Sequence, residues 1–288
     1  MIHIKSAAEI EEMKHAGSLA KQALRLAGTM VRPGVSTQEI DSSVESFIRL
    51  HGAIPTFKGY GGFPGSVCAS VNEQIVHGIP SPEVFLNEGD IISIDTGATF
   101  GGWVGDNAWT FYVGTPSDEV RGLCEVTRDC LRCGIEQAVP GNHLGDIGHA
   151  VQQLAEGSGY GVVREYVGHG VGHTMHEDPN VPNYGKKGRG VKLQVGMVIA
   201  IEPMITLGVR ENHTLGNGWT GYTWNRRLFP DPGRFLAALH GRGLEVALNL
   251  HPADGIRRHE AAYRAVAARL GLDPDTGTGI PFNIGDRA

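Results

Sequence analysis

The chain contains an internal repeat, and this repeat limits the folds open to it. Residues 33–52 read PGVSTQEIDSSVESFIRLHG, and residues 140–159, which lie 107 positions later, read PGNHLGDIGHAVQQLAEGSG. Each copy has the pattern of a turn, an amphipathic helix and a glycine stop. The same offset relates LNEGDIISID, which ends at Asp95, to LQVGMVIAIE, which ends at Glu202. Both segments are rich in β-branched residues and predict buried strands. The sequence therefore predicts two related helix–strand halves, each with a carboxylate at the end of a buried strand.

A further helix is predicted before the first copy. Ser6 followed by Glu9 forms a capping-box pattern. The apolar residues after it recur at helical spacing and predict one buried face, made of Ile10, Met13, Leu19, Ala23 and Leu24.

Composition excludes several classes of protein. At 288 residues and a net charge of −6, the chain is long enough for one large domain or two small ones. No apolar run approaches the ~18 residues needed to span a bilayer. The segment MIHIKSAAEIEEMK has acidic residues where a signal peptide needs an apolar stretch. We therefore expect a soluble, cytoplasmic protein, and the acidic balance argues against a nucleic-acid-binding surface.

The cysteines indicate no disulfide framework. Four cysteines are few for a chain of this length. Cys130 and Cys133 form a single CxxC, and no second pair accompanies it. A structural position on a helix is therefore expected for this pair rather than zinc binding.

Acidic and histidine residues recur near the ends of the predicted strands. Asp95 and Asp106 flank GATFGGWVG, a glycine-rich turn typical of a hairpin that would place the two carboxylates on adjacent strands. The second copy supplies Glu202, and YVGHGVGHTMHEDPN supplies the glycine-flanked His169. Buried carboxylates are costly unless they are paired or bind a cation. Carboxylates with one imidazole suit a divalent ion such as Mn, Fe, Co or Zn. Two such ions, ~3.5–4 Å apart, can lower the pKa of a bridging water to about 7.

Each of these residues also has an ordinary structural interpretation. Asp95 or Asp106 alone can be a turn or capping residue. A single histidine such as His169 or His176 is more often structural than a ligand. The combination of repeat-related acids with a glycine-flanked histidine favours the metal site. Other histidines lack this context and are expected at structural or surface positions, namely His3, His15, His51, His143 and His149.

Five motifs resemble the type I methionine aminopeptidases in order and spacing. They are SVCASVNEQIVHGIP, IDTGATFGGWVGD, EYVGHGVGHTMHEDPNVPNY, GMVIAIEPM and TLGNGWT, and the resemblance covers roughly residues 3–220. It implies an α/β (α+β) chain with the pita-bread (creatinase/aminopeptidase) fold, in which two pseudo-symmetric halves surround a dinuclear metal centre. The internal repeat independently predicts two such halves.

The resemblance also implies roles for individual residues. The positions that match metal ligands are Asp95, Asp106, His169 and Glu202. They would hold two divalent ions (Co, Mn, Fe or Zn), and Glu202 would also carry protons for the attacking water. His77 and His176 would bind the substrate and stabilise the tetrahedral intermediate. The positions that match the lining of the methionine pocket are Tyr60, Phe63, Cys68, Met175 and Trp219. Asn107 stands where the family commonly has Thr.

The composition changes beyond residue 220. All nine basic residues of 221–288 are Arg. Roughly residues 216–288, with PDPGRFLAALHGRGLEVALNLHPADGI, resemble a fragment of the α-glucosidase type of family 31 glycoside hydrolases. One or two βα units cannot close an eight-stranded barrel, so Asp254 is not expected to be catalytic. We expect an aminopeptidase-like domain at 1–220 whose C-terminal strands are replaced by a foreign βα segment at 221–288, which would not be an independent domain.

The changed segment also lacks an expected metal ligand. The family's fifth ligand is a Glu before His-Thr on a late strand, and no such strand follows GWT in this sequence. Glu245 is the single acid in a strand-like run there, and we expect it to be an ordinary exposed residue. Loss of this carboxylate should weaken the metal centre or reduce it to one ion.

Three functions remain open on the sequence. The first is removal of N-terminal methionine from peptides or nascent proteins by a metal-activated hydroxide, with action at the ribosome and a monomeric chain as further expectations. The second is a catalytically impaired pita-bread protein that binds peptides or partners, because the fifth ligand is missing. The third, a glycoside hydrolase represented by its tail alone, ranks far behind these two, since the carboxylate pair that such enzymes need is absent.

Overall fold

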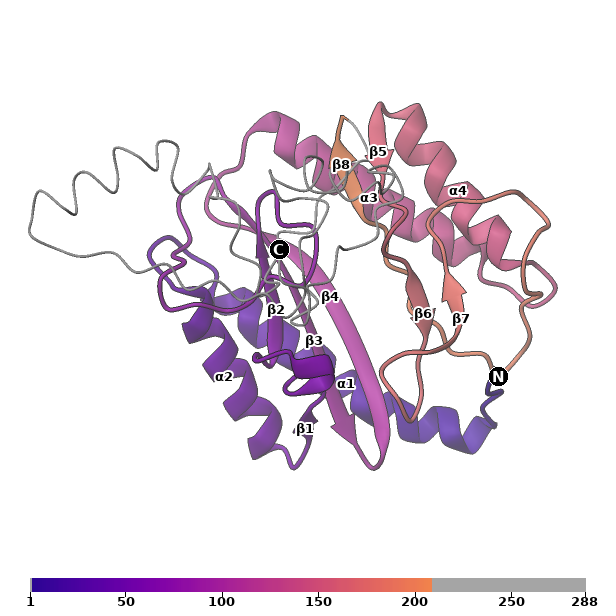
Figure 1. Cartoon of the computed structure of the whole chain (residues 1–288), viewed down its shortest axis with the longest axis horizontal. Helices are drawn as coiled ribbons and strands as arrows, with labels where there is room; N and C mark the ends of the chain where they lie inside the picture. The colour runs from indigo at the N-terminus through magenta and orange to yellow at the C-terminus, as the bar shows by residue number, and fades with distance from the viewer. Residues whose placement is uncertain (1, 209–288) are drawn as a thin grey trace, which may run out of the picture. The chain divides into compact units, whose positions relative to one another are not determined.

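The computed structural model describes residues 2–208 (Figure 1). The expectations for Trp219, Glu245, Asp254 and the segment 221–288 lie outside these residues. The helices of residues 2–208 are α1 (Ala7–Met30), α2 (Thr37–Leu50), α3 (Asp118–Gln137) and α4 (Leu144–Gly157), and a 3-10 turn, η1, lies at Tyr60–Gly62. The strands are β1 (Ile54–Pro55), β2 (Val67–Val71), β3 (Ile91–Phe100), β4 (Trp103–Tyr112), β5 (Tyr160–Val162), β6 (Gly168–Gly170), β7 (Glu177–Val181) and β8 (Ile205–Leu207).

Local sequence sets where the helices begin. The predicted capping box of α1 is confirmed, because the Ser6 hydroxyl accepts from the Glu9 N–H while the Glu9 carboxylate accepts from the Ser6 N–H. α2 begins with the same reciprocal pair of bonds at Ser36 and Glu39. The face that α1 buries is lined largely by alanine, namely Met13, Ala16, Ala20, Ala23, Leu24 and Ala27. Of the predicted face, Ile10 and Leu19 are only partly buried. Small side chains let α1 pack closely on the sheet.

The first half is an antiparallel sheet with α1 and α2 packed against it (Figure 1). β3 forms the centre, with β2 and β1 along one edge and β4 along the other. β3 and β4 are joined through Gly101 and Gly102, whose φ angles of 60° and 82° suit glycine. This is the hairpin that GATFGGWVG predicts. Ile92 and Ile94 of β3 are fully buried with Ile40 and Val44 of α2 in the core.

The second half is built from α3 and α4, which pack on each other and on two short sheets. β5 pairs with β8, and β6 pairs with β7, both antiparallel. The core beneath α4 includes Val151, Val162 and Cys130, and a neighbouring cluster holds Ile147. Cys130 and Cys133 lie on α3 and are free, as the sequence predicts.

The repeat is confirmed in its helices and only partly in its strands. α2 and α4 each have 14 residues and begin at equivalent positions. However, β3 does not end at Asp95 but continues to Phe100, because both of its neighbours extend the ladder. The predicted strand ending at Glu202 is not a regular strand. This segment lies beside β6 and forms two backbone hydrogen bonds there. The Ala200 N–H donates to the His169 carbonyl at 2.7 Å, and the Val171 N–H donates to the Val198 carbonyl at 3.2 Å. Together they form one isolated bridge, Gly170–Ile199.

No helix within residues 2–208 has the length and apolar character needed to cross a membrane. The described chain is therefore a mixed α/β structure in two related halves. The candidate site residues come from the β3–β4 hairpin of the first half, and from β6 and the segment before β8 in the second.

Candidate metal centre

The β3–β4 hairpin brings Asp95 and Asp106 to one face of the sheet. Asp106 of β4 lies opposite Gly97 of β3, and Gly97 is two residues after Asp95 on β3. Residues two apart on a strand point to the same face, so the side chains of Asp95 and Asp106 project from the same face of the sheet. The Asp95 carboxylate is buried, and its Oδ1 has no hydrogen-bond partner. Gly105, beside Asp106, allows α1 to lie directly on β4, since a Cβ there would be 2.3 Å from the Ala16 carbonyl. The first half thus contributes two neighbouring buried carboxylates.

The second half contributes His169 and Glu202 to the same place. His169 Nε2 lies 3.5 Å from Asp106 Oδ2 and 3.3 Å from Glu202 Oε1. His169 Nδ1 donates to the Gly170 carbonyl at 2.8 Å, which leaves Nε2 facing the carboxylates. The flanking glycines are necessary, because a Cβ at Gly168 would be 2.2 Å from Ala200 O and one at Gly170 would be 2.3 Å from Asp178 O. His169 is therefore fixed between two stretches of main chain.

Three of the four predicted ligands form one cluster, and the fourth adjoins it. Within the described part of the chain, ligand atoms of Asp106, His169 and Glu202 all lie within 4.8 Å of one another. Asp95 is outside this triad but contacts Asp106, which hydrogen-bonds to it and raises its pKa. The structure thus brings three of the predicted residues together and places Asp95 against one of them, while their role as ligands stays a prediction.

The acids of this cluster are strongly perturbed. Burial raises the pKa of Asp95 well above its usual value, and the charges of Asp106 and Glu202 raise it further. Burial also raises the pKa of Asp106, although the nearby His169 opposes this. For Glu202, burial and then the charge of Asp106 raise the pKa to about 8. Three buried acids face one imidazole, so their negative charge requires protons or a cation.

The cluster fits a divalent metal ion. Glu202 Oε1, like Asp95 Oδ1, is buried without a hydrogen-bond partner, although His169 Nε2 is within ion-pair distance of it. Buried oxygen atoms of this kind rarely stay unpaired in proteins. Carboxylate oxygens together with an imidazole nitrogen held by a main-chain hydrogen bond match the ligands of Mn, Fe, Co or Zn.

His176 and Tyr60 lie beside the cluster. The ring of His176 is 4.3 Å from that of His169, and its Nδ1 is 2.8 Å from the Tyr60 hydroxyl. Burial and the nearby His169 and His77 lower the pKa of His176. Burial likewise lowers the pKa of His77, whose backbone has a φ of 59° and whose ring meets Tyr166 edge-on at 5.5 Å. Both imidazoles are therefore mainly neutral at pH 7.

An apolar cluster adjoins the acids. Cys68 of β2 pairs directly with Asp95 of β3 and belongs to a buried group that also contains Phe57, Trp103, Val171 and Met175, with Phe63 packed against it. Of the predicted pocket residues, Cys68, Phe63 and Met175 are thus brought together, and Tyr60 reaches the site through His176. Trp219 lies outside the described residues.

Sequence reasoning missed three residues near the site. Trp103 is buried in the apolar cluster and stacks on His173 at 3.7 Å, a contact that its position after a glycine pair could have suggested. Asn183 is buried and donates to the Glu202 carbonyl at 2.6 Å. Tyr166 contacts His77. Asn183 and Tyr166 both lie within the motif EYVGHGVGHTMHEDPNVPNY, which is the signal that could have singled them out.

A buried cluster of acids and one histidine, between two repeated α/β halves, defines a metal-dependent hydrolase of the pita-bread type. The model of metallopeptidase family M24 matches residues 11–227, and the chain belongs to this family.

Relatives with known names agree with this assignment. A methionine aminopeptidase of Clostridium acetobutylicum is 52% identical over 223 residues, which cover 77% of this chain and 89% of that protein. Methionine aminopeptidase 1 of Bacillus subtilis is 49% identical over 223 residues, 77% of this chain and 90% of that one. The crystal structure of methionine aminopeptidase from Thermotoga maritima superposes with a TM-score of 0.74 at 43% identity, over 76% of this chain and 88% of that one.

Proposed function

We propose that this chain removes N-terminal methionine from peptides and nascent proteins in a metal-dependent reaction. The observation that carries the proposal is the triad of Asp106, His169 and Glu202, which lies beside an apolar cluster containing Met175 and Cys68. The identity to methionine aminopeptidases supports the substrate. An unbranched methionine side chain suits adaptable walls of aromatic rings and sulfur atoms.

We further propose Asp95, Asp106, His169 and Glu202 as the ligands of one or two divalent ions of Co, Mn, Fe or Zn. A bound ion of this kind supplies Lewis acidity, which polarises a peptide carbonyl and acidifies water. The buried oxygens of Asp95 and Glu202 that lack partners support this ligand set. Ionised carboxylates and a neutral imidazole are the forms that bind metal.

Glu202 is proposed to carry protons in the reaction. Its Oε1 faces the cluster in which a metal-activated water would lie, and a carboxylate in this position can act as a general base. It can therefore take a proton from the attacking water and pass one to the leaving amine. Its carbonyl is held by Asn183, which fixes the main chain behind the carboxylate.

His176 and His77 are proposed to bind the substrate beside the cluster. Both are mainly neutral at pH 7, because burial lowers their pKa values. When the Tyr60 hydroxyl donates to His176 Nδ1, the proton of the ring is on Nε2 and can be donated to a peptide oxygen. Tyr60, Phe63, Cys68, Met175 and Trp219 would line the methionine pocket.

The test is release of methionine by the full chain loaded with Co²⁺, Mn²⁺ or Fe²⁺. We expect cleavage of a Met-Gly peptide, weaker cleavage of the matching Leu-Gly peptide, and loss of both in His169→Ala. Absence of methionine release with every metal would refute the catalytic proposal. An unchanged rate in His169→Ala would refute the proposed ligand set.

A second candidate function is a catalytically impaired protein that binds peptides or partners. It is favoured by one observation, namely that no Glu-His-Thr sequence follows Trp219. Calorimetric titration with metal separates the two candidates. Two tight sites would contradict impairment, and a single weak site without methionine release would support it.

Three further expectations belong to this proposal. We propose a domain at 1–220, followed at 221–288 by a segment related to family 31 glycoside hydrolases that lacks their activity. Hydrolysis of an aryl α-glucoside would contradict the second part. We also propose a cytoplasmic monomer acting on chains that emerge from the ribosome, to be tested by light scattering and by co-sedimentation with ribosomes.

A further inference from the structure

The segment before α1 reaches across to the histidine-rich loop of the second half. Lys5 has a side chain only 1% exposed, and its Nζ lies 2.7 Å from Glu177 Oε2. The main chain of Lys5 is also fixed, because its N–H donates to the Gly196 carbonyl at 2.8 Å. A buried ammonium is costly without a partner, so Glu177 determines where this side chain can lie.

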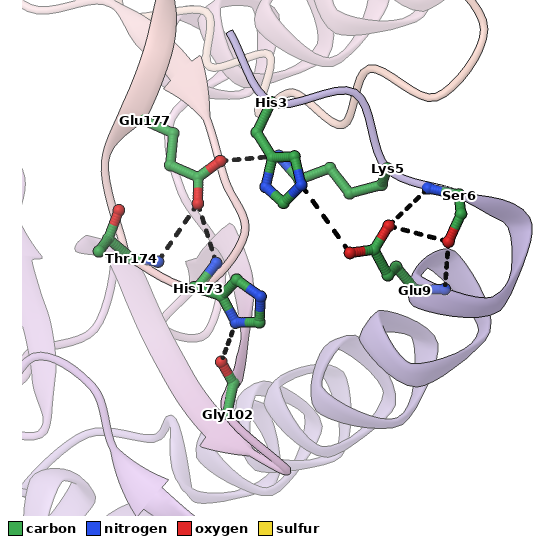
Figure 2. A network of polar contacts seen from close by, with 8 residues as sticks. All are labelled: His3, Lys5, Ser6, Glu9, Gly102, His173, Thr174 and Glu177. Atoms are coloured by element: carbon green, nitrogen blue, oxygen red, sulfur yellow. Dashed lines mark hydrogen bonds and ion pairs between the residues drawn. The ribbon is translucent and has the colours of Figure 1, made fainter. Parts of the chain in front are cut away.

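Glu177 closes the loop at residues 172–177 with its other oxygen. Glu177 Oε1 accepts from the N–H of His173 at 2.9 Å and from that of Thr174 at 3.4 Å. Gly172 leaves room for this carboxylate, since a Cβ there would be 2.4 Å from Oε1. Figure 2 shows Glu177 with Lys5 on one side and the two amides on the other. One carboxylate thus joins the segment before α1 to a tight turn.

This turn carries groups that face the site. The ring of His173 stacks on Trp103 at 3.7 Å and its Nδ1 donates to the Gly102 carbonyl at 2.8 Å. Met175 is buried in the apolar cluster beside Trp103, and His176 follows it. A displacement of the turn would therefore move the wall of the proposed methionine pocket and the His176 ring together.

The surroundings of Glu177 stabilise its ionised form. Burial raises the pKa of Glu177, but the hydrogen bonds from Lys5 and from the Thr174 N–H outweigh it and hold the pKa below its usual value. A charged acceptor binds N–H donors more strongly than a neutral one. Lys5 has no other ionised partner among its contacts in the described chain.

We infer that Lys5 and Glu177 are positioning residues, which hold the 172–177 turn so that Met175 and His176 are presented to the N-terminal residue of a peptide substrate. This inference rests on the proposed function, and it adds to the site a pair that touches neither substrate nor metal. The Lys5 ammonium holds the Glu177 carboxylate, and the carboxylate holds the main chain of the turn by accepting from its amides. The turn thereby determines the position of Met175 in the pocket wall.

The first test measures the turn itself and needs no activity. Amide hydrogen exchange of His173 and Thr174 is followed by NMR in the metal-loaded full chain and in Lys5→Met. We expect exchange to become faster by about tenfold or more, because the Glu177 carboxylate loses its anchor. The Ala200 amide, which donates to His169 O at 2.7 Å, should keep its rate. Exchange of His173 and Thr174 within about twofold of wild type would overturn the inference.

A matched control removes an exposed ion pair from the same end of the chain. Lys14 Nζ lies 2.6 Å from Glu11 Oε1, and both side chains are mostly exposed. Lys14→Met removes the same charge as Lys5→Met but leaves the turn untouched. We expect it to keep wild-type exchange, and faster exchange in this control would overturn the assignment of the effect to the Lys5–Glu177 pair.

The second test separates positioning from mere stability. In Lys5→Met, kcat/KM for a Met-Gly peptide should fall about tenfold or more, measured well below the melting temperature. The calorimetric Kd for metal should stay within about twofold, since the ligands are not displaced. Unchanged kcat/KM alongside faster amide exchange would overturn the link between the turn and the substrate.

A double variant tests whether the two residues act as one unit. Glu177→Gln keeps an oxygen for the amides but turns an NH₂ donor toward the Lys5 ammonium. Lys5→Met/Glu177→Gln removes that conflict, so its kcat/KM should be no lower than that of Glu177→Gln alone. Additive losses would overturn the pairing. A wild-type chain that releases no methionine would refute the proposed function, while the amide exchange would still decide the positioning of the turn.

Discussion

The raised pKa of Glu202 makes a quantitative prediction about the metal-free chain. Glu202→Gln replaces a buried acid by a neutral side chain of the same shape. In the folded chain the pKa of Glu202 is about 8, against 4.5 for an unperturbed Glu. The folded state therefore keeps a proton that the unfolded state releases, and this penalises folding increasingly as the pH rises from about 5 to about 8.

The magnitude follows from linkage. Each pKa unit corresponds to about 1.4 kcal/mol, so the full rise of the pKa from 4.5 to about 8 would remove about 5 kcal/mol of stability, most of it between about pH 5 and about pH 8. The Glu202 side chain is 27% exposed. Solvent screening reduces the expected loss to about 2–3 kcal/mol. Below about pH 4 the acid is mainly protonated in both states, and wild type and variant should differ little.

The assay is urea unfolding followed by far-UV circular dichroism, with EDTA present, for wild type and Glu202→Gln across this pH range. Titration of Asp95, Asp106 and the histidines contributes to both curves, so the difference between the curves isolates Glu202 together with its coupling to those acids. The variant should gain stability over wild type as the pH rises. In the metal-loaded chain the order should reverse, because a ligand that binds only the folded state stabilises it.

A parallel pair of curves would refute this reasoning. If wild type and Glu202→Gln differ by a constant free energy of unfolding from about pH 5 to about pH 8, Glu202 is not a buried, proton-holding acid. If the variant instead gained stability over wild type as the pH fell, the pKa of Glu202 would be lowered, not raised, by folding.

Three other predictions concern the ligand histidine and the packing around it. His169→Ala should weaken calorimetric metal binding by about tenfold or more, because an essential ligand is lost, and unchanged affinity would contradict its role. Gly105→Ala should cost about 1–3 kcal/mol in urea unfolding, since its Cβ would be 2.3 Å from the Ala16 carbonyl. Its control, Gly17→Ala on α1, meets nothing within 4 Å and should be neutral or stabilising by up to about 1 kcal/mol. Ile94→Ala should cost about 2–5 kcal/mol, because Ile94 is fully buried in the core, and a loss below about 1 kcal/mol would contradict that packing.

The sequence predicts this fold best where local rules suffice. Helix positions follow from capping and periodicity, which act over a few residues, so α2 and α4 begin where the repeat predicts. The hairpin through Gly101 and Gly102 likewise depends on turn chemistry alone.

Strand limits were predicted less well, because they depend on distant partners. β3 continues past Asp95 because β1 and β4 both supply hydrogen bonds there, and neither partner is visible in the sequence of β3. The segment before Glu202 has the composition of a strand, yet its pairing with β6 amounts to one isolated bridge, Gly170–Ile199. The composition of a segment shows that it can form a strand, but whether it does so depends on a neighbouring strand with which it can pair.

The candidate site divides in the same way. The repeat predicted equivalent positions for Asp95 and Glu202 alone. The hairpin placed Asp106 beside Asp95, and the flanking glycines singled out His169. In the structure Asp106, His169 and Glu202 come together, and Asp95 contacts Asp106. The Lys5–Glu177 pair spans 172 positions in the sequence, and no motif predicts it. The roles of all these residues stay predictions until the variants above are measured.

The two glycines around His169 also restrict how this site could be re-engineered. Any side chain at Gly168 or Gly170 would collide with carbonyl groups of another segment, at 2.2 and 2.3 Å. A library intended to alter metal preference should therefore leave both codons fixed and vary the carboxylates. Random mutagenesis of these two positions would sample misfolded chains rather than new metal specificities.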